Sequence, residues 1–88
     1  MKASIRGRQY AIRFKAIRSL NGSCESGSPP REIVIRKSLT GQPLLDTLIH
    51  EMLHAAFEDM CEAAVEETAG DISTVLWRLG WRPREAIE

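Results

Sequence analysis

The sequence predicts an α+β fold, in which a small antiparallel β-hairpin or sheet packs against two antiparallel helices. In the N-terminal half, apolar and polar residues alternate in two segments, which is typical of strands with one buried face. In the C-terminal half, apolar residues recur at helical spacing in two longer segments. We expect residues 1–88 to form a single domain, because a chain of 88 residues has room for only one core.

The first strand is expected over residues 9–17, where Tyr10 and Arg13 fall on opposite sides of the alternating pattern. Residues 21–30 are rich in Gly, Ser and Pro, so we expect an exposed connecting loop there. Alternation returns over residues 31–39, which form the second expected strand. Two strands joined in this way most simply pair antiparallel.

The first helix is expected to begin near Pro43, because the missing N–H of proline costs nothing in the first helical turn. A turn is expected at residues 57–60, with Asp59 as the N-cap of a second helix over residues 61–79. We expect residues 82–88 to form a mobile tail.

Each helix is expected to turn one apolar stripe toward the core. In the first helix this stripe comprises Leu45, Leu48, Ile49, Met52, Leu53 and Ala56. In the second helix it comprises Val65, Ala69, Ile72, Leu76 and Leu79. The polar residues Thr47, His50, Glu51 and His54 then share the adjoining face of the first helix.

The net charge is zero, but residues 1–45 carry nine Lys or Arg against two Glu, and residues 46–88 carry three Arg against ten acids. Either the two halves attract each other within the fold, or the basic half binds nucleic acid or an acidic partner. No apolar segment approaches the length of a membrane span, and the N-terminus lacks a hydrophobic signal segment. We therefore expect a cytoplasmic protein without membrane association, whose Cys24 and Cys61 are free thiols.

The most specific motif is the pentapeptide His50-Glu51-Met52-Leu53-His54. Helical positions four apart share a face, so both imidazoles can bind one metal ion. His50 and His54 are also the only histidines in the chain. The motif predicts a Zn²⁺ site with His50 and His54 as ligands.

A catalytic zinc takes three protein ligands and keeps one position for water. The metzincin pattern places its third histidine at position 60 and a glycine at position 57, where this chain has Met60 and Phe57. The remaining candidates are Glu58, Asp59, Cys61, Glu62, Glu66, Glu67 and Asp71. An antiparallel second helix sets residues 62–66 opposite the histidines. Glu62 is favoured because it extends the buried stripe, and Glu66 is the next choice.

Glu51 is expected to lie beside the metal rather than on it, within reach of a bound water. Zinc lowers the pKa of such a water to about 7, so Glu51 can act as general base and return the proton to a leaving amine. These residues predict a zinc-dependent metallopeptidase with a peptide or protein substrate. The strand at residues 31–39 is a candidate edge for pairing an extended peptide. Tyr10, Arg36 and backbone N–H groups are the candidate oxyanion donors.

Two other functions remain open. The same zinc site in a non-catalytic binding module would hold the two helices together and present the basic half to DNA or a protein partner. A different zinc hydrolase, acting on cell-wall peptides or another amide, is the third hypothesis.

Residues 45–55, followed by Glu62-Ala63-Ala64-Val65 and Leu76-Trp77-Arg78-Leu79-Gly80-Trp81, resemble small zinc-metallopeptidase-like proteins of tailed phages and prophages. These proteins are similar to minimal gluzincins and SprT-like domains. The resemblance implies a minimal zincin-like core, with a strand before the metal helix and histidine ligands at His50 and His54. It also implies a catalytic glutamate at Glu51, a glutamate ligand at Glu62, and a phage or prophage protein in a bacterial host.

Overall fold

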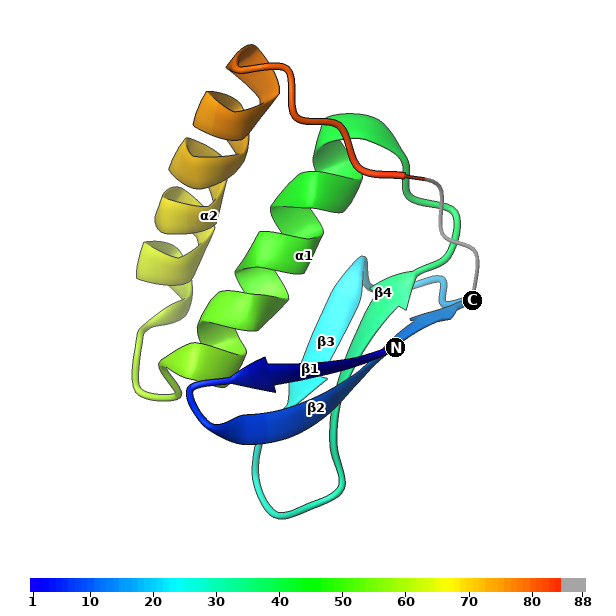
Figure 1. Cartoon of the computed structure of the whole chain (residues 1–88), viewed down its shortest axis with the longest axis vertical. Helices are drawn as coiled ribbons and strands as arrows, with labels where there is room; N and C mark the ends of the chain where they lie inside the picture. Colours follow the sequence, from blue (N-terminus) through cyan, green and yellow to red (C-terminus); the bar gives the residue numbers. More distant parts are fainter. Residues whose placement is uncertain (85–88) are drawn as a thin grey trace.

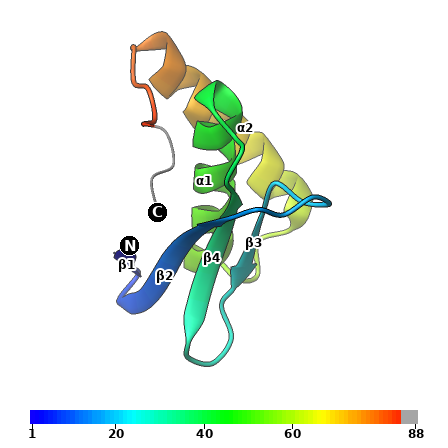
Figure 2. The ribbon, with the colours of Figure 1, turned by 90° about the vertical axis from the view of Figure 1, so that its right-hand side faces the viewer.

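Four strands and two helices make up the computed structural model, which describes residues 1–84 of the chain. The elements are β1 (Lys2–Ile5), β2 (Arg8–Lys15), β3 (Gly22–Glu25), β4 (Arg31–Arg36), α1 (Gly41–Ala56) and α2 (Glu62–Arg78). The strands form one sheet in the order β1-β2-β4-β3, and α1 lies on one face of it (Figure 1). Figure 2 shows α2 beyond α1, on the side away from the sheet. The predicted α+β class is confirmed.

The β1–β2 hairpin was not predicted from the sequence. Its register pairs Ile5 with Arg8, so only Arg6 and Gly7 form the turn. Both turn residues have positive φ, 49° at Arg6 and 79° at Gly7. Two positive φ values are the geometry of a type I′ turn, whose twist matches that of the flanking strands. The hairpin adds β1 to the sheet as a short edge strand beside β2.

The two strands that were predicted lie side by side, but the prediction of antiparallel pairing was wrong. β2 and β4 pair in parallel, with Ile12 opposite Ile33. A parallel pair needs a connection that returns the chain to the starting end of the first strand. β3 supplies that return: it lies within the predicted loop at residues 21–30 and pairs antiparallel with β4 at the edge of the sheet.

The core lies between the sheet and α1. The sheet contributes Tyr10, Ile12, Ile33 and Ile35, all buried, and α1 contributes Leu44 and Ala55. The Tyr10 hydroxyl donates a weak hydrogen bond to the Ala55 carbonyl oxygen at 3.4 Å. This contact joins the sheet to the last turn of α1.

Both helices form close to where they were expected. α1 begins at Gly41, and α2 begins at Glu62 with Cys61 as its N-cap, so the prediction of Asp59 as N-cap was wrong. α2 ends close to the expected residue 79. Gly80 follows it with a positive φ of 95°, and the Gly80 N–H donates to the Trp77 carbonyl oxygen. Of the predicted tail at residues 82–88, positions 85–88 lie outside the described residues.

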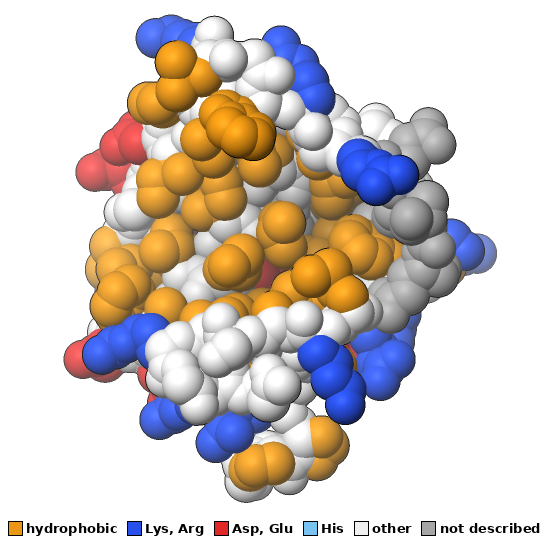
Figure 3. Space-filling view, in the orientation of Figure 1, with side chains coloured by type: hydrophobic (Ala, Val, Ile, Leu, Met, Phe, Trp, Pro, Cys, Tyr) orange, Lys and Arg blue, Asp and Glu red, His pale blue; other side chains and the backbone are white. Residues whose placement is uncertain are grey.

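The buried faces of the helices differ from the predicted stripes. The residues that α1 buries are Leu44, Thr47, Glu51 and Ala55. Met52, from the predicted stripe, is 37% exposed. In α2, Val65 and Ala69 are buried as predicted, but Ile72 is 38% exposed and Leu79 71% exposed. Figure 3 shows hydrophobic side chains spread over the face on which both helices are visible. Neither described helix combines the length and apolar composition that a membrane span needs.

Candidate metal centre

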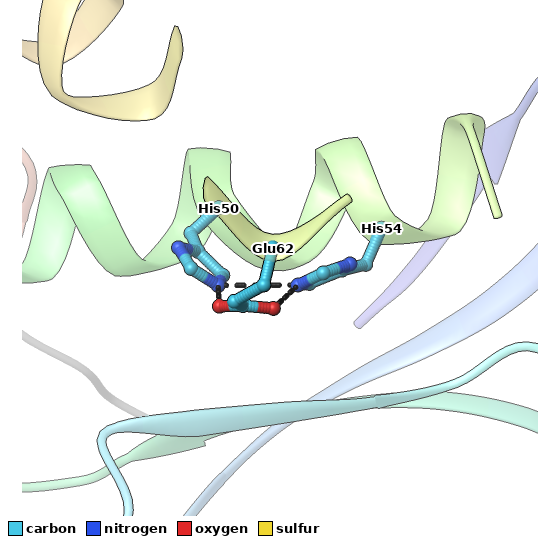
Figure 4. Close-up of side chains that lie close together, drawn as sticks. All are labelled: His50, His54 and Glu62. Atoms are coloured by element: carbon cyan, nitrogen blue, oxygen red, sulfur yellow. Dashed lines mark hydrogen bonds and ion pairs between the residues drawn. The ribbon is translucent and has the colours of Figure 1, made fainter. Parts of the chain in front are cut away.

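His50, His54 and Glu62 converge where the end of α1 faces the start of α2 (Figure 4). The Nε2 atoms of the two histidines are 3.2 Å apart. One carboxylate oxygen of Glu62 lies 2.9 Å from His50 Nε2, and the other lies 2.9 Å from His54 Nε2. Two imidazoles and one carboxylate therefore point toward a common position. We call His50, His54 and Glu62 the metal group.

The local fold explains this convergence. Residues four apart on α1 place both imidazoles on one side of the helix. After α1 the chain turns tightly, with the Met60 N–H donating to the Phe57 carbonyl oxygen at 3.1 Å. Glu62 is the first residue of α2, so its carboxylate lies at the positive end of the helix dipole. The turn and the antiparallel return of α2 therefore carry Glu62 back to the histidines.

The donor set fits a zinc ion. Zinc bonds to imidazole nitrogen and carboxylate oxygen measure about 2.0–2.2 Å, so the ligand atoms of a tetrahedral site are about 3.3–3.5 Å apart. The observed separations of 2.9 and 3.2 Å are close to those edges. Two histidines and a glutamate are also a ligand set that catalytic zinc uses while keeping a fourth position for water.

Glu51 lies next to this group and is only 6% exposed, although its side chain is charged. No hydrogen bond to its carboxylate is found within residues 1–84. Burial raises the pKa of the Glu51 carboxyl, whereas His50 and His54 lower this pKa and Glu62 raises it. The carboxylate of Glu51 lines the cleft and is not among the fully buried unpaired groups of residues 1–84, and a cation bound in the cleft would favour its charged form.

A cleft of about 750 Å³ runs over these residues, between α1, α2 and β3. The residues that line it are Leu20, Asn21, Gly22, Cys24, Ser26, Asp46, Thr47, His50, Glu51, His54, Glu58, Glu62, Glu66 and Gly70. A Cβ atom at Gly22 would lie 2.9 Å from Thr47 Cγ2 and 3.1 Å from Glu51 Cγ. The absence of a side chain at Gly22 therefore lets β3 approach α1 closely enough to form one wall of the cleft.

The edge strand beside the site is β3, not the strand predicted at residues 31–39. β4 is flanked by β2 and β3, whereas β3 ends the sheet and pairs only with β4. The prediction of residues 31–39 as the peptide-binding edge was therefore wrong. The composition of residues 21–30 predicted a loop, so the edge strand β3 within them was not predicted.

Sequence reasoning gave no site role to Cys24 and Asp46, which also line the cleft. Cys24 is half-buried, and burial together with the negative charges of Glu51, Glu25 and Glu58 raises the pKa of its thiol to about 11. In Asp46, a carboxylate oxygen accepts a hydrogen bond from the Ser73 hydroxyl at 3.3 Å. The available signal for Asp46 was its position four residues before His50 on the same helix.

The other candidate ligands lie apart from the metal group. Glu66 lines the cleft, and Glu58 forms an ion pair with Arg8. Cys61, Asp59, Glu67 and Asp71 are exposed. Glu62 is exposed as well, with 62% of its side chain accessible, so the expectation that it extends the buried stripe of the second helix was wrong. Within residues 1–84, the only His, Cys, Asp or Glu group of three or more within ligand reach is His50, His54 and Glu62.

The candidate oxyanion donors Tyr10 and Arg36 do not line the cleft. Tyr10 is buried in the core, and Arg36 donates to the Arg18 carbonyl oxygen. Backbone N–H groups therefore remain the candidates for this role.

Comparisons with family models, with curated proteins and with solved structures gave no significant match.

Proposed function

We propose that this protein is a zinc-dependent metallopeptidase in which His50, His54 and Glu62 hold Zn²⁺ and Glu51 acts as general base. One observation carries the proposal: the three ligand-type side chains and the buried carboxylate of Glu51 meet in a single cleft. A cytoplasmic location, and the bacterial host that the resemblance to phage proteins implies, belong to the same proposal.

When bound, Zn²⁺ supplies the Lewis acid that polarises a scissile carbonyl and lowers the pKa of a water. Glu51 accepts the proton of the attacking water and delivers it to the leaving amine. Its place in the cleft beside the three ligand-type side chains suits this task, because a general base must lie within hydrogen-bond reach of the proton it accepts.

The free edge of β3 offers backbone N–H and C=O groups to an extended peptide. A peptide paired there would run along the cleft wall past the metal group, with its backbone oriented by the strand. The proposed substrate is therefore a peptide segment in extended conformation rather than a helix.

The first experiment measures zinc in the purified protein by mass spectrometry of the element. We expect about one equivalent per chain and none in the His50→Ala/His54→Ala double variant. The second experiment compares wild type with Glu51→Gln on a peptide library. Zinc retained with cleavage lost in Glu51→Gln would support the proposal. A wild-type protein that binds no zinc, or a Glu51→Gln variant that cleaves as well as wild type, would overturn it.

The second candidate function is a non-catalytic zinc-containing binding module, with DNA or a protein as partner. The placement of ligands favours it, because Glu62 at the start of α2 and the histidines of α1 would cross-link the two helices. In that case zinc removal would raise hydrogen exchange throughout α2, while zinc-loaded wild type and Glu51→Gln would both leave the peptide library uncut.

A further inference from the structure

One side of α2 carries a row of mainly apolar residues, which we call the outer face of α2. Its members, Thr68, Ile72, Val75 and Leu79, follow one another at steps of four, three and four residues, so they lie along one side of the helix. Ile72 is 38% exposed, Val75 57% and Leu79 71%, and none of the four lines the cleft. Figure 3 shows hydrophobic side chains spread over both helices on a face where neither histidine is visible. The outer face of α2 is therefore separate from the metal group.

This row has the spacing of a helix–helix interface. Alternating steps of four and three residues are the repeat by which two helices interlock their side chains in a coiled coil. Single exposed apolar residues are ordinary on a protein surface, whereas a contiguous exposed row marks an interaction site. Among the helices and strands of residues 1–84, α2 packs on α1 alone. The exposed part of the outer face thus has no covering element in the described chain.

Charge is divided along α2. Residues 62–71 contain four acidic residues and no Lys or Arg, whereas residues 72–78 contain Arg78 and no acidic residue. Asp71 and Arg78 are seven residues apart, so both border the outer face along the same edge. Both are exposed, and neither forms an ion pair within residues 1–84. The charges along this edge are complementary to those of the same helix running in the opposite direction.

We propose that the outer face of α2 is the interface of a homodimer, in which α2 pairs antiparallel with the same helix of a second copy about a two-fold axis. Ile72 then packs against Val75 of the partner subunit, and Asp71 pairs with Arg78 of the partner subunit. The two-fold axis repeats each contact. Ion pairs that flank an apolar seam set the direction in which helices associate. A parallel pairing would instead bring the acidic first halves of both helices together, which is unfavourable.

The charges also favour a second copy over a membrane as the occupant of this face. Asp71 borders the row, and anionic lipids would repel it. α2 has 17 residues and is about 26 Å long, so the contact is smaller than a standard interface and we expect the dimer to dissociate at micromolar concentration. The inference does not rest on the proposed peptidase function, since the outer face neither lines the cleft nor contributes to the metal group.

The first test is sedimentation equilibrium of the full-length protein from nanomolar to millimolar concentration, with a reductant present because Cys61 is an exposed thiol. We expect a reversible monomer–dimer equilibrium. Asp71→Arg and Arg78→Asp should each weaken dimerisation at least about tenfold, because each places like charges opposite one another twice per dimer. Asp59→Arg is the matched control, since Asp59 is exposed in the turn before α2 and lies outside the outer face.

Mixing the two charge variants tests the antiparallel direction itself. Asp71→Arg and Arg78→Asp should associate with each other at least as well as wild type does with itself, because every opposed pair then carries opposite charges. Val75→Glu should abolish association, since it buries a charge in the apolar seam, and circular dichroism should show an unchanged fold at this exposed position. A wild type that stays monomeric at millimolar concentration overturns the proposal, whether or not it binds lipid vesicles. A dimer that neither charge variant weakens, or variants that fail to associate when mixed, also overturn it.

The outcome for the metal group is separate. A dimer that persists in the His50→Ala/His54→Ala double variant supports this interface even if the protein binds no zinc and cleaves no peptide. A zinc-dependent peptidase that is monomeric at every concentration overturns the interface and leaves the proposed function standing.

Discussion

Gly22 of β3 and Glu51 of α1 approach each other so closely that a Cβ atom on Gly22 would lie 3.1 Å from Glu51 Cγ. The same Cβ atom would lie 2.9 Å from the Val34 carbonyl oxygen, which belongs to the rigid backbone of β4. Neither neighbour can withdraw freely, because Glu51 is buried and Val34 is paired in the sheet. Gly22 therefore sets the distance between the edge strand and the helix that carries the metal group.

Replacement of Gly22 by alanine should push β3 away from α1. We expect Gly22→Ala to lower the free energy of unfolding by about 1–3 kcal/mol, as other overpacked sites do. Urea denaturation would measure the change. Gly27→Ala is the control, since a Cβ atom at Gly27 meets nothing within 4 Å, and it should shift stability by less than about 0.5 kcal/mol. Equal effects of the two substitutions would show that β3 can move away from α1 at residue 22 without a loss of stability.

The thiol of Cys24 should react slowly with iodoacetamide at neutral pH. Because only the thiolate reacts, a pKa of about 11 leaves roughly 0.1% of the thiol reactive at pH 8. In a Cys61→Ser background with chelator present, the alkylation rate should rise about tenfold per pH unit and level off near pH 11. Mass spectrometry of the labelled protein would follow it.

The neighbouring carboxylate offers a check on the cause of this shift. Glu51→Gln removes a negative charge that disfavours the thiolate, so it should lower the pKa of Cys24 and speed alkylation at pH 8. Glu67→Gln should leave the rate unchanged. If Cys24 alkylated at pH 8 as fast in the native protein as in urea, it would not be buried in an acidic cleft.

The identity of the third ligand can be decided by comparing neighbouring glutamates on α2. Loss of outer partners of metal ligands weakens binding about 10–100-fold, so loss of a charged ligand in Glu62→Gln should weaken zinc binding by at least about 100-fold. Glu66→Gln should bind zinc nearly as well as wild type, because Glu66 lies outside the group of three. Competition with a zinc-binding dye would measure both affinities. The reverse order would transfer the ligand role to Glu66.

The proximity of His50 and His54 was predictable because spacing within one helix is local information. Placing Glu62 beside them needed one more assumption, a tight antiparallel return, and the turn after Phe57 provides it. β3 was not predictable in this way. Gly22-Ser23-Cys24-Glu25 has the composition of a loop, and it becomes a strand only because its backbone pairs with β4.

The buried face of α1 was mispredicted for a related reason. Apolar residues cover more than one face of this helix, so periodicity alone does not say which face meets the sheet. The face that does so includes Thr47 and Glu51, polar residues that sequence patterns assign to solvent. Both residues line the cleft on the α1 side. Gly22 of β3 packs closely against them, which limits their exposure to solvent.

The difference in burial between two isoleucines leads to a prediction for replacing each of them by alanine. Ile33 is 0% exposed in the central strand β4, whereas Ile72 is 38% exposed on α2. Ile33→Ala should cost about 2–5 kcal/mol, since it removes methyl and methylene groups from a packed core and leaves a cavity. Ile72→Ala should cost less than about 1 kcal/mol, because part of that side chain is already hydrated and alanine favours the helix. Urea denaturation at low protein concentration would compare the two. A cost above about 2 kcal/mol at Ile72 would show that this helix face is covered in solution and that the exposure described for it is wrong.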